Sequence, residues 1–228
     1  MEMQAWRARL MTGQWFSHLP VQLQNSLLAL ARIRRLSPGQ ALFQRGDPPC
    51  GLYAVLDGAV RIGTMNEQGK EALLSLVEPW HWFGEIGVFD GQPRTHDAYA
   101  VGPCTLLQIP QAALLDLLTA QPAHWRQLAL LMSHKLRLTF ISLEQLSLMP
   151  APARLAHRLL LIAEGYGELE QPRRVLQLPQ EQLALMLSLS RQTTNQILKD
   201  LQSQGILQLS YGAIEILDAT RLRALATL

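Results

Sequence analysis

The stretch that decides the fold is QEQLALMLSLSRQTTNQILKDLQSQG, residues 180–205. Apolar residues recur at helical spacing over Gln180–Leu187 and again over Arg191–Ser203. Ser188-Leu189-Ser190 separates the two segments, and Gly205 follows the second, where helices commonly end. The sequence therefore predicts two helices joined by a short turn.

The first turn of the second predicted helix carries side chains suited to DNA. Ser190 is a good N-cap, which leaves Arg191, Gln192 and Thr193 exposed. Arginine can bond guanine in two places and glutamine can do the same for adenine, and we expect Thr193, Thr194, Asn195 and Lys199 to contact phosphates. The predicted DNA-binding residues are Ser190, Arg191, Gln192, Thr193, Asn195, Gln196 and Lys199. The alternative is an ordinary helix with a solvated polar face, although Leu189–Leu198 contains no acidic residue.

The segments on either side extend this motif. Ile206–Leu209 and Ala213–Leu217 flank Ser210-Tyr211-Gly212, which predicts a β-hairpin. A helix over Arg154–Glu164 precedes the motif, and Met149-Pro150-Ala151-Pro152 before it is a predicted hinge. Helix, turn, helix and hairpin, in that order, indicate a winged helix-turn-helix.

Upstream of the hinge, Ala123–Leu148 has no glycine or proline and predicts one long helix. It carries two apolar stripes, so two burial partners are expected. One partner would be the N-terminal domain and the other the same helix of a second subunit; a helix buried within one chain is the alternative. We assign Leu128, Leu131, Leu138 and Ile141 to the dimer contact. The second stripe is Trp125, Ala129, Met132, Leu136, Phe140 and Leu143.

The first half of the chain reads as a short helical entry followed by strands. The spacing of Leu23, Leu27, Leu30 and Ile33 predicts an amphipathic helix over residues 21–35, which Ser37-Pro38-Gly39 would end. Short apolar runs separated by glycines then indicate an antiparallel sheet folded over on itself. The predicted strands are Ala41–Arg45, Leu52–Asp57, Ala59–Thr64, Glu71–Val77 and Thr105–Ile109.

Composition excludes several classes of protein. The chain has 228 residues, 48% of them hydrophobic and 17% charged, as in an ordered globular protein with room for two domains. No apolar run is long enough to cross a membrane, and the charged N-terminus does not resemble a signal peptide, so we expect a cytoplasmic protein. Two isolated cysteines and scattered histidines predict no disulfide framework and no metal site. No nucleophile–base pair or phosphate-binding loop indicates an enzyme.

The distribution of charge favours a polyanionic partner for the second half of the chain. Residues 1–119 hold 9 basic and 10 acidic side chains, whereas residues 120–228 hold 11 basic and 8 acidic. The basic excess therefore lies where the helix-turn-helix is predicted.

Taken together, residues 37–228 resemble the cyclic-AMP receptor (Crp/Fnr) family of bacterial transcription regulators. The matching parts are FGEIGVFDGQPRTHDA (83–98), the long helix, and LSRQTTNQILKDL (189–201) with its wing. The resemblance implies an α+β fold: a cyclic-nucleotide-binding-type β-roll (jelly roll) in 1–120, a dimerisation helix in 121–149, and a winged helix-turn-helix in 150–228. It also implies a homodimer that binds a two-fold-related site on double-stranded DNA and acts with RNA polymerase. Gln192 and Gln196 differ from the best-known member, so a different operator is expected.

The same resemblance implies an effector site in the roll. Arg94, nine residues after Glu85, would pair with a cyclic phosphate, and Glu85 would accept a bond from a ribose hydroxyl. A short helix after Gly84 would direct backbone N–H groups at the anion, while Thr95 would add a hydroxyl and Thr139 would meet the base. The candidate effector is a cyclic nucleotide such as cyclic AMP.

Other interpretations stay open at this point. His96, Asp97 and Phe140 differ from the family pattern, and Glu85 and Arg94 could instead form an ion pair in a vestigial site. The effector could then be another small molecule, or the regulator could need none, or respond to redox state or haem. A nucleotide-sensing module without DNA function is the remaining alternative.

Overall fold

The computed structural model describes residues 2–65, 67–68, 71–167, 169 and 171–227, apart from the side chains of residues 2–4. Its internal contacts divide the chain into two compact units, residues 1–136 and 137–228. The long helix α6 (Trp125–Leu148) begins in the first unit and ends in the second. The predicted three-part division at residues 120 and 149 stays a prediction.

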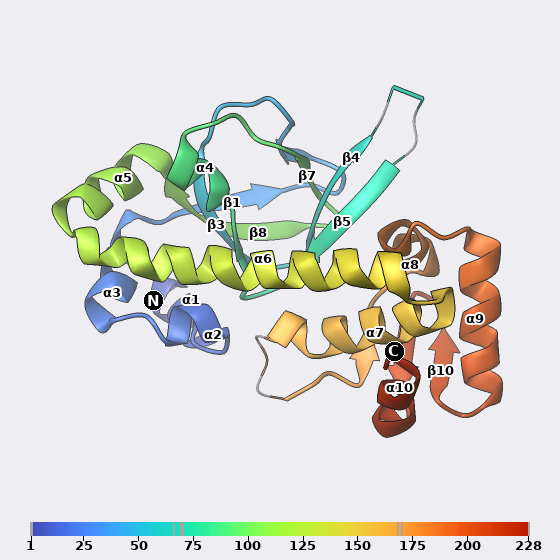
Figure 1. Cartoon of the computed structure of the whole chain (residues 1–228). Coiled ribbons are helices and arrows are strands. Elements are labelled where there is room, and N and C mark those ends of the chain that lie inside the picture. The colour runs from blue at the N-terminus through green and yellow to red at the C-terminus, as the bar shows by residue number, and fades with distance from the viewer. Residues whose placement is uncertain (1, 66, 69–70, 168, 170, 228) are drawn as a thin grey trace. The chain divides into compact units, whose positions relative to one another are not determined.

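The first unit combines helices with short antiparallel strands (Figure 1). Before the roll come α1 (Glu2–Leu10), α2 (Gln14–Ser17) and α3 (Val21–Leu30). The strands are β1 (Arg32–Leu36), β2 (Ala41–Phe43), β3 (Gly51–Asp57), β4 (Val60–Met65), β5 (Glu71–Val77), β6 (Trp82–Phe83), β7 (Asp97–Ala100) and β8 (Cys104–Pro110). The helices among and after the strands are α4 (Ile86–Asp90), α5 (Gln111–Ala120) and a 3₁₀ turn, η1 (Pro122–His124).

The strands form two four-stranded antiparallel sheets, ordered β1-β8-β3-β6 and β2-β7-β4-β5. The predicted folded-over sheet is therefore confirmed. Strand β3 contributes to both hydrophobic cores of the unit. Leu52, Ala54 and Leu56 belong to one core, and Tyr53 and Val55 belong to the other. Alternate residues of a strand point to opposite faces, so a continuous apolar run is stable only where both faces are covered.

The predicted helix over residues 21–35 is wrong in its last third. Helix α3 ends at Leu30, Ala31 is extended (φ −68°, ψ 143°), and Ile33 lies in β1. Five residue pairs join β1 to β8, from Arg32 opposite Gln108 to Leu36 opposite Cys104. The interval between Leu30 and Ile33 suits a helix, but the ladder with a strand about 70 residues further on overrides that local pattern.

The second unit is a winged helical domain (Figure 1). Its elements after α6 are α7 (Ala151–Ala163), a 3₁₀ turn η2 (Gly165–Gly167), β9 (Val175–Leu176), α8 (Gln180–Leu187), α9 (Arg191–Ser203), β10 (Leu207–Ser210), β11 (Ala213–Ile216) and α10 (Ala219–Leu225). The strands form a sheet ordered β10-β11-β9. The predicted hairpin is confirmed, with Ser210 opposite Ala213 around a two-residue turn.

Candidate DNA-binding helix and effector site

Local chemistry sets the start of helix α9. Ser188 adopts a left-handed backbone (φ +52°) that ends α8, and two residues later the Ser190 hydroxyl accepts the backbone N–H of Thr193 at 2.9 Å. This bond satisfies one of the donors that a helix leaves open at its N-terminus. Buried Leu183 and Leu187 on α8 and Ile197 and Leu198 on α9 supply the apolar residues of the motif. The turn geometry follows from these residues as predicted.

Most of the residues assigned to DNA contact lie on the open side of α9. Arg191, Gln192, Thr193, Gln196 and Lys199 are exposed, and so is the capping Ser190. Asn195 is half-buried and donates to Oε1 of Gln180 at 2.8 Å, so it already has a structural role between α9 and the start of α8. The exposed group carries two positive charges and several amide and hydroxyl groups, which can contact both bases and phosphates.

Thr194 does not belong with them. Its side chain is fully buried, and its hydroxyl has no hydrogen-bond partner among the described residues. Positions 194, 197, 198 and 201 share the inner face of α9, since residues three and four apart meet on one side of a helix. The predicted phosphate contact of Thr194 is therefore wrong.

Two acidic side chains occupy the exposed face before any DNA is bound. Arg191 pairs with Glu181 at 3.1 Å, and Gln196 donates to Asp200 at 2.8 Å. The side chains of Arg191 and Glu181 are 75% and 56% exposed, and a pair this exposed contributes little stability. Arg191 can therefore exchange this partner for a base or a phosphate at small cost.

The wing adds a residue that sequence reasoning did not assign to DNA. Tyr211 and Gly212 form the turn between β10 and β11; Gly212 has φ +71°, and Tyr211 is fully exposed. A large aromatic side chain at the end of a hairpin is available for contact with a partner. The hairpin prediction already located this turn, so its tip residue could have been named from the sequence.

In the first unit, Arg94 is the centre of the predicted effector site. It is only 7% exposed, and its guanidinium donates to the carbonyl oxygens of Gly51 (2.7 Å) and Gly84 (3.0 Å). It also donates to Sγ of Cys50 at 3.2 Å and lies 4.5 Å from the ring centroid of Phe43. The Nε atom is buried and has no partner among the described residues. These three bonds hold the cation in place and leave Nε–H and one Nη1–H without a bond to the described residues.

The neighbours of Arg94 explain why glycine stands at position 84. Gly84 has φ +99°, and a Cβ there would come within 2.7 Å of the carbonyl oxygen of Gly51. Close to Arg94, burial raises the pKa of the Tyr53 hydroxyl well above its ordinary value; the hydroxyl therefore stays protonated and donates to Cys50 at 3.1 Å. Helix α4 follows Gly84 and Glu85, as the predicted short helix requires.

Glu85 has a partner that the sequence analysis missed. The carboxylate is 3% exposed and pairs with Nζ of Lys135, on α6, at 2.7 Å. Among the described residues Glu85 and Arg94 do not pair with each other, so the alternative of a Glu85–Arg94 ion pair is wrong. The sequence did carry a signal for this partner. Lys135 lies one helical turn before Thr139, which the family resemblance assigns to the effector site, so both residues lie on the same side of α6.

The two threonines assigned to the same site remain predictions. Thr95 is exposed, and its hydroxyl lies 2.9 Å from Nδ1 of His96, whose pKa is lowered by burial and by nearby Arg45. Thr139 is exposed on the part of α6 that belongs to the second unit.

The residues present fit a cyclic nucleotide in chemical type. Arg94 supplies a fixed cation for a phosphate, and Glu85 can accept a hydroxyl bond while it is paired with Lys135. An ionised carboxylate has about four acceptor positions, so one ammonium does not saturate it. The site therefore combines a buried cation with a carboxylate that has acceptor positions left.

Helix α6 uses its two apolar stripes differently from the prediction. Leu128 and Leu131 are buried in the core of the first unit, so their assignment to the dimer contact is wrong. Leu138 is half-buried and Ile141 is 39% exposed. The strongly exposed apolar residues include three of the second stripe: Leu136 (52%), Phe140 (62%) and Leu143 (58%).

The described residues present neither a membrane span nor a cluster of metal ligands. None of their helices is long and apolar enough to cross a membrane. Nor does any group of three or more His, Cys, Asp or Glu side chains in the described ranges come together as metal ligands would.

A β-roll that holds the cassette of Gly84, Glu85 and Arg94, together with a winged helix-turn-helix, defines a class of DNA-binding regulators. Residues 33–121 match the family described as cyclic nucleotide-binding domain, and residues 153–225 match the Crp-like helix-turn-helix domain. The chain belongs to the CRP/FNR family of transcription regulators.

Relatives from two bacteria have similar length. The chain is 32% identical over 186 residues to a CRP-like cAMP-activated global transcriptional regulator of Mycobacterium tuberculosis (81% of this chain, 83% of the relative). It is 33% identical over 195 residues to the cyclic AMP receptor protein of Thermus thermophilus (85% and 88%). The crystal structure of a CRP/FNR-family transcriptional regulator, also from Thermus thermophilus, is similar, with TM-score 0.68, 28% identity and coverage of 86% and 98%. The relative from Mycobacterium tuberculosis and the solved structure are named as transcriptional regulators, and the chain is a regulator of that family.

Proposed function

We propose that the chain is a homodimeric, sequence-specific transcription regulator whose DNA affinity is set by a cyclic nucleotide bound in the β-roll. The observation that carries the effector site is the buried Arg94, whose Nε donor has no partner among the described residues. Two relatives are named for cyclic AMP, which makes it the first candidate effector. RNA polymerase is the expected partner at promoters by family membership.

In this proposal each cassette group has one task. Arg94 pairs with the cyclic phosphate through charge-assisted hydrogen bonds, and Glu85 accepts the ribose 2′-hydroxyl. Lys135 holds the Glu85 carboxylate at 2.7 Å, so a nucleotide bound to Glu85 is connected to α6 through one ion pair. Thr95 and Thr139 would add contacts to the phosphate and the base.

The proposed dimer contact lies on the second stripe of α6. Leu136, Phe140 and Leu143 follow at intervals of four and three residues, the spacing of a coiled-coil seam. All three are more than half exposed in the single chain, and such an apolar row on a helix gains stability when a second copy covers it. Ile141 and Leu138 would lie beside this seam.

An effector can act only by favouring one state of the protein over another. The ion pair between Glu85 and Lys135 gives the ligand a route to such a preference, because filling the cassette changes what surrounds the carboxylate that holds α6. Helix α9 of each subunit would then read one half of a two-fold-related DNA site, with Arg191 and Gln192 toward the bases.

Calorimetric titration of the full-length protein with cyclic AMP, cyclic GMP and cyclic di-GMP tests the effector site. We expect saturable binding of one of them in the micromolar range, and its loss in Arg94→Ala. Arg61→Ala is the matched control, since Arg61 forms a part-exposed ion pair with Glu71 on β4 and β5 and has no place in the cassette. Binding that survives Arg94→Ala, or that Arg61→Ala abolishes equally, would contradict the assignment.

A regulator that needs no effector is the second candidate, and one observation favours it. The Arg94 guanidinium is already bonded to two carbonyl oxygens and a sulfur, so three of its five N–H donors are used within the chain. Silence from all three nucleotides, in protein that binds promoter DNA tightly without them, would support this second candidate and exclude the first.

A further inference from the structure

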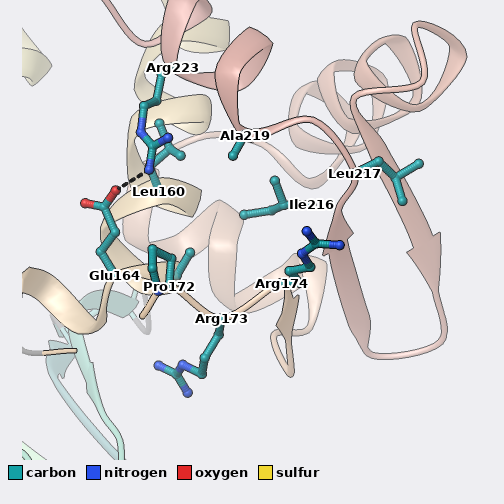
Figure 2. Close-up of a pocket in the computed structure, with 10 residues that line it drawn as sticks. Leu160, Glu164, Pro172, Arg173, Arg174, Ile216, Leu217, Ala219 and Arg223 are labelled. Atoms are coloured by element: carbon teal, nitrogen blue, oxygen red, sulfur yellow. Dashed lines mark hydrogen bonds and ion pairs between the residues drawn. The ribbon is translucent and has the colours of Figure 1, made fainter. Parts of the chain in front are cut away.

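The second unit contains a surface pocket that belongs to neither the DNA-binding helix nor the effector cassette (Figure 2). Its lining comes from α7, the segment before β9, the end of β11, and α10. The volume is about 290 Å³. At roughly 30 Å³ per water molecule, that is space for about ten waters, or for an organic molecule of similar size.

One part of the lining is apolar. The side chains come from Leu160, Ala163, Pro172, Ile216, Leu217 and Ala219. Leu160, Ala163 and Ile216 are buried residues of the unit, whereas Leu217 is 52% exposed. A firm apolar floor with a more open rim suits the hydrocarbon part of a ligand, since water there is poorly hydrogen-bonded.

The charged part of the lining has a surplus of two positive charges, from three arginines and one glutamate. Arg223 pairs with Glu164 at 3.1 Å, and Nη2 of Arg173 donates to the carbonyl oxygen of Ile162 at 3.2 Å. Arg174 is exposed, and its guanidinium makes no hydrogen bond or ion pair with the residues that the structure describes. In Figure 2, Ile216 and Ala219 lie between the Arg223–Glu164 pair and Arg174.

We propose that this pocket binds a small organic carboxylate with a compact apolar body. Arg174 pairs with the carboxylate, and the apolar body covers Ile216 and Leu160. A planar guanidinium binds a carboxylate through two parallel hydrogen bonds, and the net charge of the lining selects an anion over a neutral molecule of the same shape. The volume selects a small molecule over a folded partner.

The experiment uses the full-length protein with ¹³C-labelled isoleucine methyl groups, assigned at position 216 through Ile216→Val. Benzoate is the probe, and benzyl alcohol is its uncharged analogue. We expect a saturable shift of the Ile216 methyl signal with benzoate and about tenfold weaker binding of benzyl alcohol, as for the loss of one charge-assisted hydrogen bond.

Two variants locate the anion contact. Arg174→Gln should weaken benzoate about tenfold, while Arg221→Gln should leave it unchanged, because Arg221 is on α10 but donates to the carbonyl oxygen of Gln204 and is not in the lining. An Ile216 signal that does not saturate, equal binding of benzyl alcohol, or equal weakening by both variants would each overturn the proposal. Neither DNA nor a cyclic nucleotide enters this measurement, so its outcome is independent of the proposed function.

Discussion

At the scale of single residues, neighbours in the sequence have opposite roles. Thr193 is exposed and its backbone N–H is capped by Ser190, whereas Thr194 is fully buried among the inner residues of α9. A helix turns by about 100° per residue, so a shift of one position can move a side chain from the exposed face of α9 to the buried face. Residue type alone did not separate these two threonines, but the helical period of Ile197, Leu198 and Leu201 would have done so.

Arg191 is the residue whose loss should affect sequence recognition most directly. Arg191→Ala should weaken specific DNA binding by about 1–3 kcal/mol per half-site, because a bidentate contact to guanine is lost. Arg191→Lys is the matched control: it keeps the charge but not the planar fork, so non-specific binding should persist while specificity falls. Titration against operator and scrambled DNA measures both. An unchanged ratio of the two affinities would remove Arg191 from base recognition.

Lys135 should matter for stability before any ligand is added. Lys135→Met removes the ammonium group that pairs with the carboxylate of Glu85, a residue that is only 3% exposed. We expect a loss of about 1–3 kcal/mol in the free energy of unfolding, less than for a fully buried pair because Lys135 is one-third exposed. Urea unfolding measures it. In the Glu85→Gln background the same change should cost much less, and equal costs in the two backgrounds would show that the side chains do not interact.

At the scale of elements, α6 shows how one helix serves two environments. Its first half carries Leu128 and Leu131 into the core of the first unit, and its second half exposes Leu136, Phe140 and Leu143. The sequence correctly predicts the long helix and two apolar stripes. The folded roll decides which of the two stripes is buried within the chain. Helical periodicity alone therefore could not assign one stripe to the core and the other to the dimer contact.

Phe140→Glu should prevent the proposed dimer from forming, because it puts a charge in the centre of the exposed seam. Sedimentation velocity across a concentration series measures the change. Leu130→Glu is the matched control on the same helix: Leu130 is 46% exposed, but at 100° per residue it lies about a third of a turn around α6 from Leu136. Dissociation by both variants, or by Leu130→Glu alone, would place the dimer contact elsewhere.

At the scale of the whole molecule, the proposed regulation is a coupling between effector and DNA. If the effector raises operator affinity by some factor, bound operator must raise effector affinity by the same factor, because the two binding events share one thermodynamic cycle. A factor of about 5–150 is typical of such coupling. Titration of the effector with and without operator, and the reverse, measures both sides. Saturable binding of both with a factor of one would contradict allosteric control.

By itself, the sequence determined the local elements and the class of protein. The spacing of leucines, the serine cap and the glycine stops set α8, α9 and the hairpin, because those signals act within a few residues along the chain. The order of roll, long helix and winged motif was enough to indicate the family.

Only the tertiary structure decided the contacts that join distant segments. Arg32–Leu36 became a strand because β8 lies beside it, Leu128 became a core residue because the N-terminal helices and the roll cover it, and Glu85 met Lys135 fifty residues away. Burial and pairing of this kind depend on which surfaces meet in space. The pocket around Arg174 has the same origin, since its lining is drawn from α7, β11 and α10 and no local pattern brings those segments together.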